Sequence, residues 1–100
     1  MTDLGPAWLR SFAAIARAGS VTRAAQQVHR RQSAVSTHLQ HLEAAVGARL
    51  VERSTRALAL TAQGLAFLPH AQALLRAQDD AHAAVRPARE AVTHRLGISE

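Results

Sequence analysis

Apolar residues recur at helical spacing in the first part of the chain. Trp8, Phe12 and Ile15 are separated by four and then three residues. This spacing predicts a helix over residues 3–18 whose apolar face is buried in a core. We expect Asp3 to cap or favour the start of this helix, Pro6 to be tolerated in its first turn and Gly19 to cap its end.

Two shorter helices are predicted next, over residues 21–28 and 32–46, joined by the polar and basic residues 29–31. Ser20 is the candidate N-cap of the first of them, with Thr22 as the competitor. In the second helix, apolar residues at spacings of four, three and four form one stripe that we expect to be buried. This stripe consists of Val35, Leu39, Leu42 and Val46.

The opposite face of the helix over residues 32–46 carries short, uncharged polar side chains, whereas a solvated face usually carries Glu, Lys and Arg. Side chains of this kind suit hydrogen bonds with base edges in a DNA groove. An ordinary polar surface is the alternative interpretation. The candidate base-reading positions are Gln32, Ser33, Ser36, Thr37 and Gln40, with His38 beside them.

Residues 48–61 predict a short two-stranded hairpin, because apolar residues flank the polar residues 52–56 on both sides. Its tip carries Arg53 and Arg56. Arginine can enter a narrow minor groove or hold a phosphate with its forked side chain, so the hairpin is a candidate DNA-binding wing. A solvated loop is the alternative.

A long helix is predicted from Ala62 to about residue 86 or beyond, with Thr61 as its N-cap. Pro69 stands inside it, where we expect a bend or local loosening of the helix. Residues at alternating steps of three and four form a seam that a small domain cannot bury alone, so we expect a second copy to cover it in a two-fold dimer. The predicted dimerisation residues are Leu68, Ala71, Leu75, Gln78, His82 and Val85.

The net charge of +5 is concentrated in one region of the chain. Residues 17–56 hold seven arginines and two acidic residues, which account for the whole excess, while the segments on either side are neutral. Local basic charge beside a polar helix face is typical of nucleic-acid binding. Arg23, Arg30 and Arg31 are therefore candidate phosphate contacts.

Other function classes find less support in the sequence. The chain has no cysteine, no apolar run of membrane-spanning length and no signal-peptide layout, which favours a cytoplasmic protein without a membrane partner. It also lacks a glycine-rich phosphate loop and a nucleophile motif, so no enzyme is predicted. His38 and His41 are three residues apart, but no further ligand supports them, and we expect no metal or cofactor. A helical dimerisation module without a nucleic-acid role is the alternative function, and it leaves the clustered arginines unexplained.

The ordered runs along the chain resemble the N-terminal domain of LysR-type transcriptional regulators over about residues 3–92. These runs are GSVTRAA at 19–25, QSAVS at 32–36, LE at 42–43, VG at 46–47, ER at 52–53 and LT at 60–61, with Leu50 and Gly64. The resemblance implies a mainly α fold in which residues 1–61 form a winged helix-turn-helix of three helices and a two-stranded wing. Residues 62–92 would then be a dimerising linker helix, and residues 93–100 the start of a missing domain that binds a small-molecule effector.

The resemblance further implies sequence-specific binding of double-stranded DNA by a homodimer on an interrupted palindrome. It places Gln32, Ser33, Ser36, Thr37 and His38 in the major groove, and Arg53 and Arg56 on the adjacent minor groove or backbone. The chain departs from the family pattern at two positions. Arg31 stands where a Ser or Thr usually caps the recognition helix, so either the cap is lost or Ser33 takes a shifted role. Thr37 stands where many members have arginine, which removes a bidentate guanine contact and leaves contact with a thymine methyl.

Overall fold

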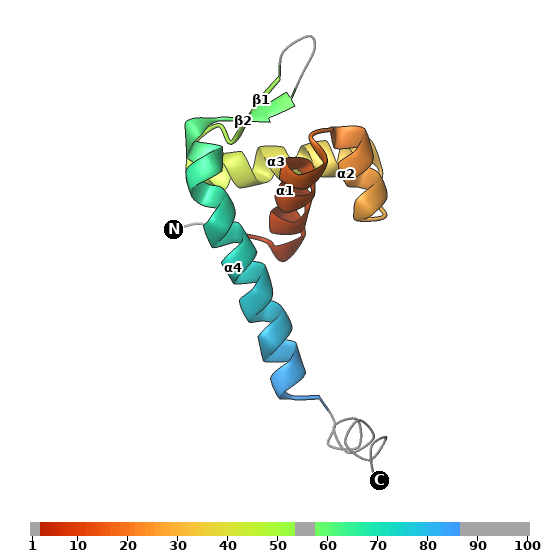
Figure 1. Cartoon of the computed structure of the whole chain (residues 1–100), viewed down its shortest axis with the longest axis vertical. Coiled ribbons are helices and arrows are strands. Elements are labelled where there is room, and N and C mark those ends of the chain that lie inside the picture. The colour runs from red at the N-terminus through yellow and green to blue at the C-terminus, as the bar shows by residue number, and fades with distance from the viewer. Residues whose placement is uncertain (1–2, 54–57, 87–100) are drawn as a thin grey trace.

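The computed structural model describes residues 3–53 and 58–86 and shows a mainly helical chain with one two-stranded sheet (Figure 1). The predicted fold class is confirmed. The elements, in order, are α1 (Pro6–Ala18), α2 (Val21–Gln27), α3 (Gln32–Val46), β1 (Val51–Arg53), β2 (Leu58–Leu60) and α4 (Ala62–Ala84). Arg56 at the wing tip, and residues 93–100, which were assigned to a further domain, lie outside the described residues.

The ends of α1 are set by its glycines and its proline. The helix begins at Pro6 after Gly5, which makes no side-chain capping bond, so the prediction that Asp3 starts it is wrong. Proline suits the first helical position because its φ is already helical and its missing N–H would have no helical partner there. At the other end Gly19 takes the left-handed conformation (φ 68°), and its N–H donates to the carbonyl of Ile15, as predicted.

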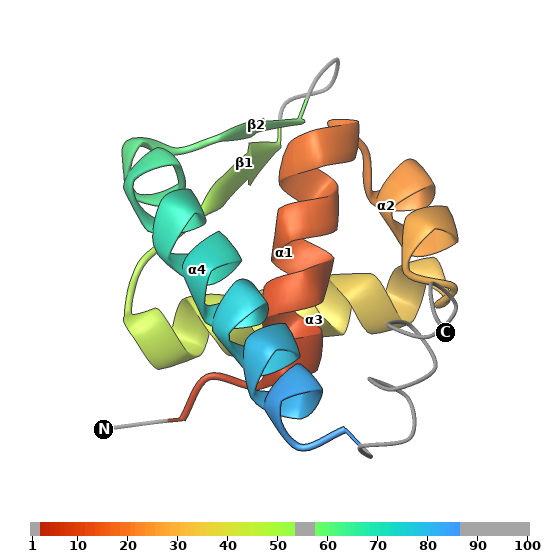
Figure 2. The same cartoon turned by 60° about the horizontal axis from the view of Figure 1, so that its bottom comes forward.

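The first helix is the central element of the core. Figure 2 shows α1 between α2 and α4, with α3 crossing behind it. Phe12 and Ile15 are fully buried, and the rings of Phe12 and Phe67 lie 5.7 Å apart, which joins α1 to α4. Val35 and Leu42 bring α3 into the same cluster. The orientation of α3 is therefore fixed mainly by its packing against α1.

Glu43 ties the loop after α3 to that helix. Its Oε2 accepts hydrogen bonds from the backbone N–H groups of Leu50 (2.7 Å) and Val51 (3.2 Å). Both N–H groups belong to the entry into β1, which pairs antiparallel with β2 in the register Val51 to Leu60. The position of the wing is thus coupled to the position of α3.

Thr61 joins the wing to the start of α4. As predicted, it is the N-cap of α4, and its hydroxyl accepts from the N–H of Gly64 at 2.9 Å. The same hydroxyl donates to the carbonyl of Arg49 at 2.6 Å, so one side chain fixes both the helix start and the loop before β1.

The long helix leaves the three-helix body and extends beyond it (Figure 1). Its first turns pack on the core of the same chain: Ala71 has no exposed surface, and Leu68 and Leu75 contact the core cluster. Ala71 is thus inaccessible to a second copy, which corrects the predicted dimerisation seam at this position. Leu68 and Leu75 are only partly buried against the core, so their place in a dimer seam stays a prediction. Farther along, Gln78 is half-buried and His82 and Val85 are exposed.

No helix in the described ranges is long and apolar enough to cross a membrane.

Candidate nucleic-acid interface

The third helix divides into a buried stripe and a polar outer face, as its sequence predicts. Val35 and Leu42 are fully buried and Leu39 is 4% exposed, whereas Val46, the last residue of the predicted stripe, is only half-buried. On the outer face Ser36 is half-buried, and the remaining predicted positions are exposed: Gln32, Ser33, Thr37 and Gln40. Over residues 32–40 this face presents hydroxyl and amide groups to solvent.

The start of α3 carries no side-chain cap. Arg31 occupies the N-cap position with extended backbone, and neither it nor Ser33 bonds to the first N–H groups of the helix. The sequence left two alternatives open, a lost cap or a shifted role for Ser33. The structure shows that the side-chain cap of α3 is lost. The free N–H groups and the helix dipole give this end a partial positive charge, to which exposed Arg30 and Arg31 add. The combination attracts an anion such as a DNA phosphate.

The turn before α3 is tightly built. Ser20 caps α2 by accepting a hydrogen bond from the N–H of Arg23, so Ser20 and not Thr22 is the N-cap of this helix. His29 takes a left-handed conformation (φ 55°) that reverses the chain between α2 and α3. Arg23 on α2 is exposed, as a phosphate contact requires.

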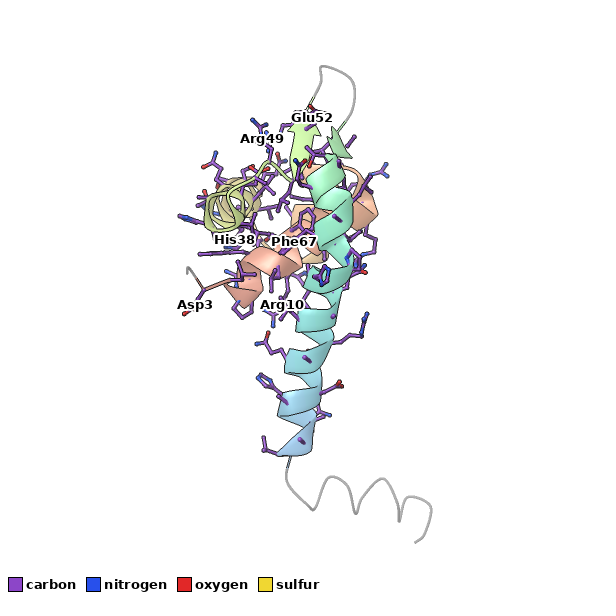
Figure 3. The ribbon with its side chains drawn as sticks, turned by 90° about the vertical axis from the view of Figure 1, so that its left-hand side faces the viewer. Asp3, Arg10, His38, Arg49, Glu52 and Phe67 are labelled. Carbon is purple, nitrogen blue, oxygen red and sulfur yellow. The ribbon has the colours of Figure 1, made fainter. Side chains whose placement is uncertain are left out.

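His38 lies away from the other predicted base-reading residues. Each residue of a helix is turned by about 100° from the one before it, so His38 lies on the opposite flank of α3 from Ser36. Its Nδ1 is 2.7 Å from the hydroxyl of Ser11, a fully buried side chain of α1. Figure 3, in which α3 is seen end-on, shows His38 on the side of α1. The structure therefore does not place His38 with the polar face, and it gives the residue a partner within the fold.

The neighbouring His41 also faces α1. Its ring stacks on Trp8 with the centroids 5.3 Å apart. The two histidines therefore contact α1 side by side, and among the described residues no group of three or more potential ligands could hold a metal ion.

Burial, together with the charges of Arg30 and His41, lowers the pKa of His38 from its ordinary value of 6.5. The folded protein therefore binds this proton less tightly than the unfolded chain does. The stability that depends on neutral His38 is fully present above pH 6.5 and is lost as the pH falls through the lowered pKa.

We expect the His38→Gln variant to lose less free energy of unfolding between pH 7.5 and pH 5 than the unmodified protein does. Glutamine can still bond to Ser11 but does not take up a proton. Urea unfolding followed by Trp8 fluorescence at the two pH values measures the difference. His70→Gln, the same substitution at an exposed position on α4, is the matched control. Equal pH dependence in the His38→Gln variant and the unmodified protein would contradict the assignment.

A polar cleft of about 320 Å³ separates α3 from β1. Exposed Arg53 lies at the end of β1 and belongs to the lining, as the wing prediction requires. Arg49, in the loop before β1, also lines the cleft, and its side chain is 73% exposed. In the sequence Arg49 is one of the seven arginines of residues 17–56, and a loop has no periodicity from which the position of its side chain could be predicted. The full lining is Ser36, Leu39, Gln40, Glu43, Arg49, Val51 and Arg53.

Comparison with protein families gives a match over residues 6–65 to the bacterial regulatory helix-turn-helix proteins of the lysR family. The chain is 44% identical over 96 residues to the HTH-type transcriptional regulator protein PtxE of Stutzerimonas stutzeri, covering 96% of this chain and 47% of PtxE. It is 37% identical over 94 residues to the HTH-type transcriptional regulator ShiR of Corynebacterium glutamicum, covering 92% of this chain and 32% of ShiR. The chain thus spans less than half the length of these two relatives.

Solved structures show the same arrangement of elements. The CbnR DNA-binding domain in its complex with DNA superimposes with a TM-score of 0.71 at 40% identity, over 82% of this chain and 99% of that one. The oxidized form of Corynebacterium glutamicum OxyR superimposes with a TM-score of 0.80 at 31% identity, over 86% of this chain and 28% of that one. The family match covers most of the described fold, including α3 and the wing, and the chain therefore belongs to the lysR family of bacterial regulatory helix-turn-helix proteins.

Proposed function

We propose that this chain binds double-stranded DNA in a sequence-specific manner, with α3 in the major groove and the wing on the adjacent minor groove or backbone. The observation that carries the proposal is the exposed, uncharged polar face of α3. Arginines lie near it, Arg30 and Arg31 at the start of the helix and Arg53 in the cleft between α3 and β1. Helices of this kind read bases with side chains near their N-terminal end. Similar structures bound to DNA, such as the CbnR DNA-binding domain, add support.

The residues divide into two roles. Gln32, Ser33, Ser36 and Thr37 approach base edges, where an amide can pair with adenine and a threonine methyl can contact thymine. The arginines bind phosphate and set the position of the helix without selecting sequence. They are Arg23, Arg30, Arg31 and Arg53, together with Arg56 of the wing tip.

A dimer is part of the proposal. Apolar side chains remain exposed on α4, with Leu65 63%, Leu74 46% and Val85 82% exposed, and a second copy would cover part of this surface. Of the predicted seam, Gln78, His82 and Val85 stay accessible. Two α3 helices related by a two-fold axis would read an interrupted palindrome. In the full-length cytoplasmic regulator, a further domain from about residue 93 would bind a small-molecule effector, as the family resemblance implies.

Selection of DNA from a random pool by this chain tests the function. We expect enrichment of two similar half-sites related by two-fold symmetry. Gln32→Ala should change the base preference at particular positions, whereas Arg53→Ala should weaken binding to all sequences about equally. If Gln32→Ala left the ranking of sites unchanged, the placement of α3 would be wrong. If no sequence were enriched and binding did not depend on salt, the dimerisation-module alternative would be favoured.

A further inference from the structure

Arg49 lies between the two elements that are proposed to enter adjacent grooves. A major groove and its neighbouring minor groove are separated by one sugar–phosphate backbone. A protein with α3 in one groove and its wing in the other must straddle that backbone, so the cleft between them faces phosphates. Figure 3 shows Arg49 on the β1 side of α3, and its side chain lines this cleft with those of Ser36 and Arg53.

The backbone of Arg49 is held, while its side chain is not. Its carbonyl accepts from the hydroxyl of Thr61 at 2.6 Å, and the next N–H, that of Leu50, donates to Glu43 at 2.7 Å. The guanidinium is attached to a fixed point but is largely solvent-exposed. A long cation on a rigid base can reach a nearby anion at a small entropic cost.

The ion pair that Arg49 forms with Glu43 is weak. Its Nε is 3.8 Å from Oε2 of Glu43, and that oxygen already accepts from the N–H groups of Leu50 and Val51. The guanidinium of this pair is 73% exposed, although the Glu43 side chain is only 15% exposed. An ion pair at this distance with a largely solvated cation contributes little to stability. Glu43 would remain bonded to the loop if Arg49 moved, so the guanidinium can be transferred to a phosphate without disturbing the fold.

We propose that Arg49 is a DNA-contacting residue that binds a phosphate oxygen of the strand lying between α3 and the wing. The inference rests on the proposed DNA binding and adds to it a contact from the loop before β1. Guanidinium is suited to this role because its fork donates two parallel hydrogen bonds to one phosphate.

The test is a titration of the labelled duplex enriched in the selection experiment, by the unmodified chain and by Arg49→Gln, at several salt concentrations. We expect Arg49→Gln to lose affinity on the order of tenfold at moderate salt, and the slope of log affinity against log salt to fall by about 0.9 per protomer. Arg49→Lys keeps the charge and should keep most of the slope while losing part of the affinity. Arg10→Gln removes the same charge from an exposed site that Figure 3 shows at the opposite end of the body, and should change neither quantity.

A second experiment, in which Arg49→Gln is combined with Glu43→Gln, distinguishes direct contact of Arg49 with phosphate from neutralisation of the Glu43 charge by Arg49. Glu43→Gln keeps an acceptor oxygen for the two loop N–H groups but removes the negative charge. If Arg49 touches phosphate, Arg49→Gln lowers the affinity and the slope in this background as well. If the loss disappears there, Arg49 only screens Glu43 and the inference is overturned. An unchanged slope for Arg49→Gln in the original background would also overturn it, whereas salt-independent behaviour of the unmodified chain would instead refute the proposed function.

Discussion

Gly64→Ala is expected to destabilise the domain by about 3 kcal/mol or more, because α4 passes directly against the backbone at the entry to β1. A Cβ at position 64 would lie 2.1 Å from the carbonyl oxygen of Leu50 and 3.0 Å from its carbonyl carbon. That oxygen accepts the N–H of Thr61, so it cannot move away without breaking the contact that begins α4. Urea unfolding followed by Trp8 fluorescence or circular dichroism measures the loss.

The sign of this effect distinguishes packing from helix propensity. Gly64 lies inside a helix, where alanine would ordinarily stabilise by about 1 kcal/mol. Gly19→Ala is the matched control, because its Cβ would meet nothing within 4 Å and the cost comes only from the positive φ of 68°. We expect that control to lose about 1 kcal/mol. A stabilising Gly64→Ala would show that α4 does not approach β1 so closely.

The bounds and caps of several helices could be predicted from residues close together in the sequence. The bounds of α3 follow from an apolar stripe and a terminal glycine, and Gly47 indeed takes a left-handed conformation (φ 73°). Ser20 and Thr61 cap their helices because a hydroxyl just before a helix bonds to the third residue after it. These features depend on residues close together in the sequence. The start of α1 was the exception, because the helix begins at Pro6 and not at Asp3.

Features that depend on distant residues were not predicted. His38 is assigned to the groove if only its own helix is considered, but its partner Ser11 is 27 residues away on α1. The spacing of Leu68, Ala71 and Leu75 correctly indicates a buried face, yet spacing alone does not say whether the same chain or a second copy covers it. The place of Arg49 beside α3 and β1 in one cleft likewise depends on tertiary structure, which spacing along the chain does not reveal.

Two neighbouring substitutions in α3 should give opposite results. Val35→Asp places a carboxylate where the side chain has no exposed surface, and it removes apolar contacts with the core cluster. A buried charge without a partner costs more than about 4 kcal/mol, which is most of the stability of a typical small domain. We expect this variant to lose its helical circular dichroism signal and its cooperative thermal unfolding.

Thr37→Asp places the same group on the exposed face only two residues later, and we expect its thermal unfolding to be almost unchanged. A carboxylate in the first turns of a helix is compatible with the helix dipole, so the fold has no reason to be weakened. In the proposed complex, however, that carboxylate would face base edges and phosphates, and like charges brought together cost several kcal/mol. Fluorescence anisotropy should therefore show a loss of DNA affinity of at least about 100-fold. A Thr37→Asp variant that binds DNA normally would remove this face from the interface, whereas one that unfolds like Val35→Asp would show that α3 is rotated from the orientation described above.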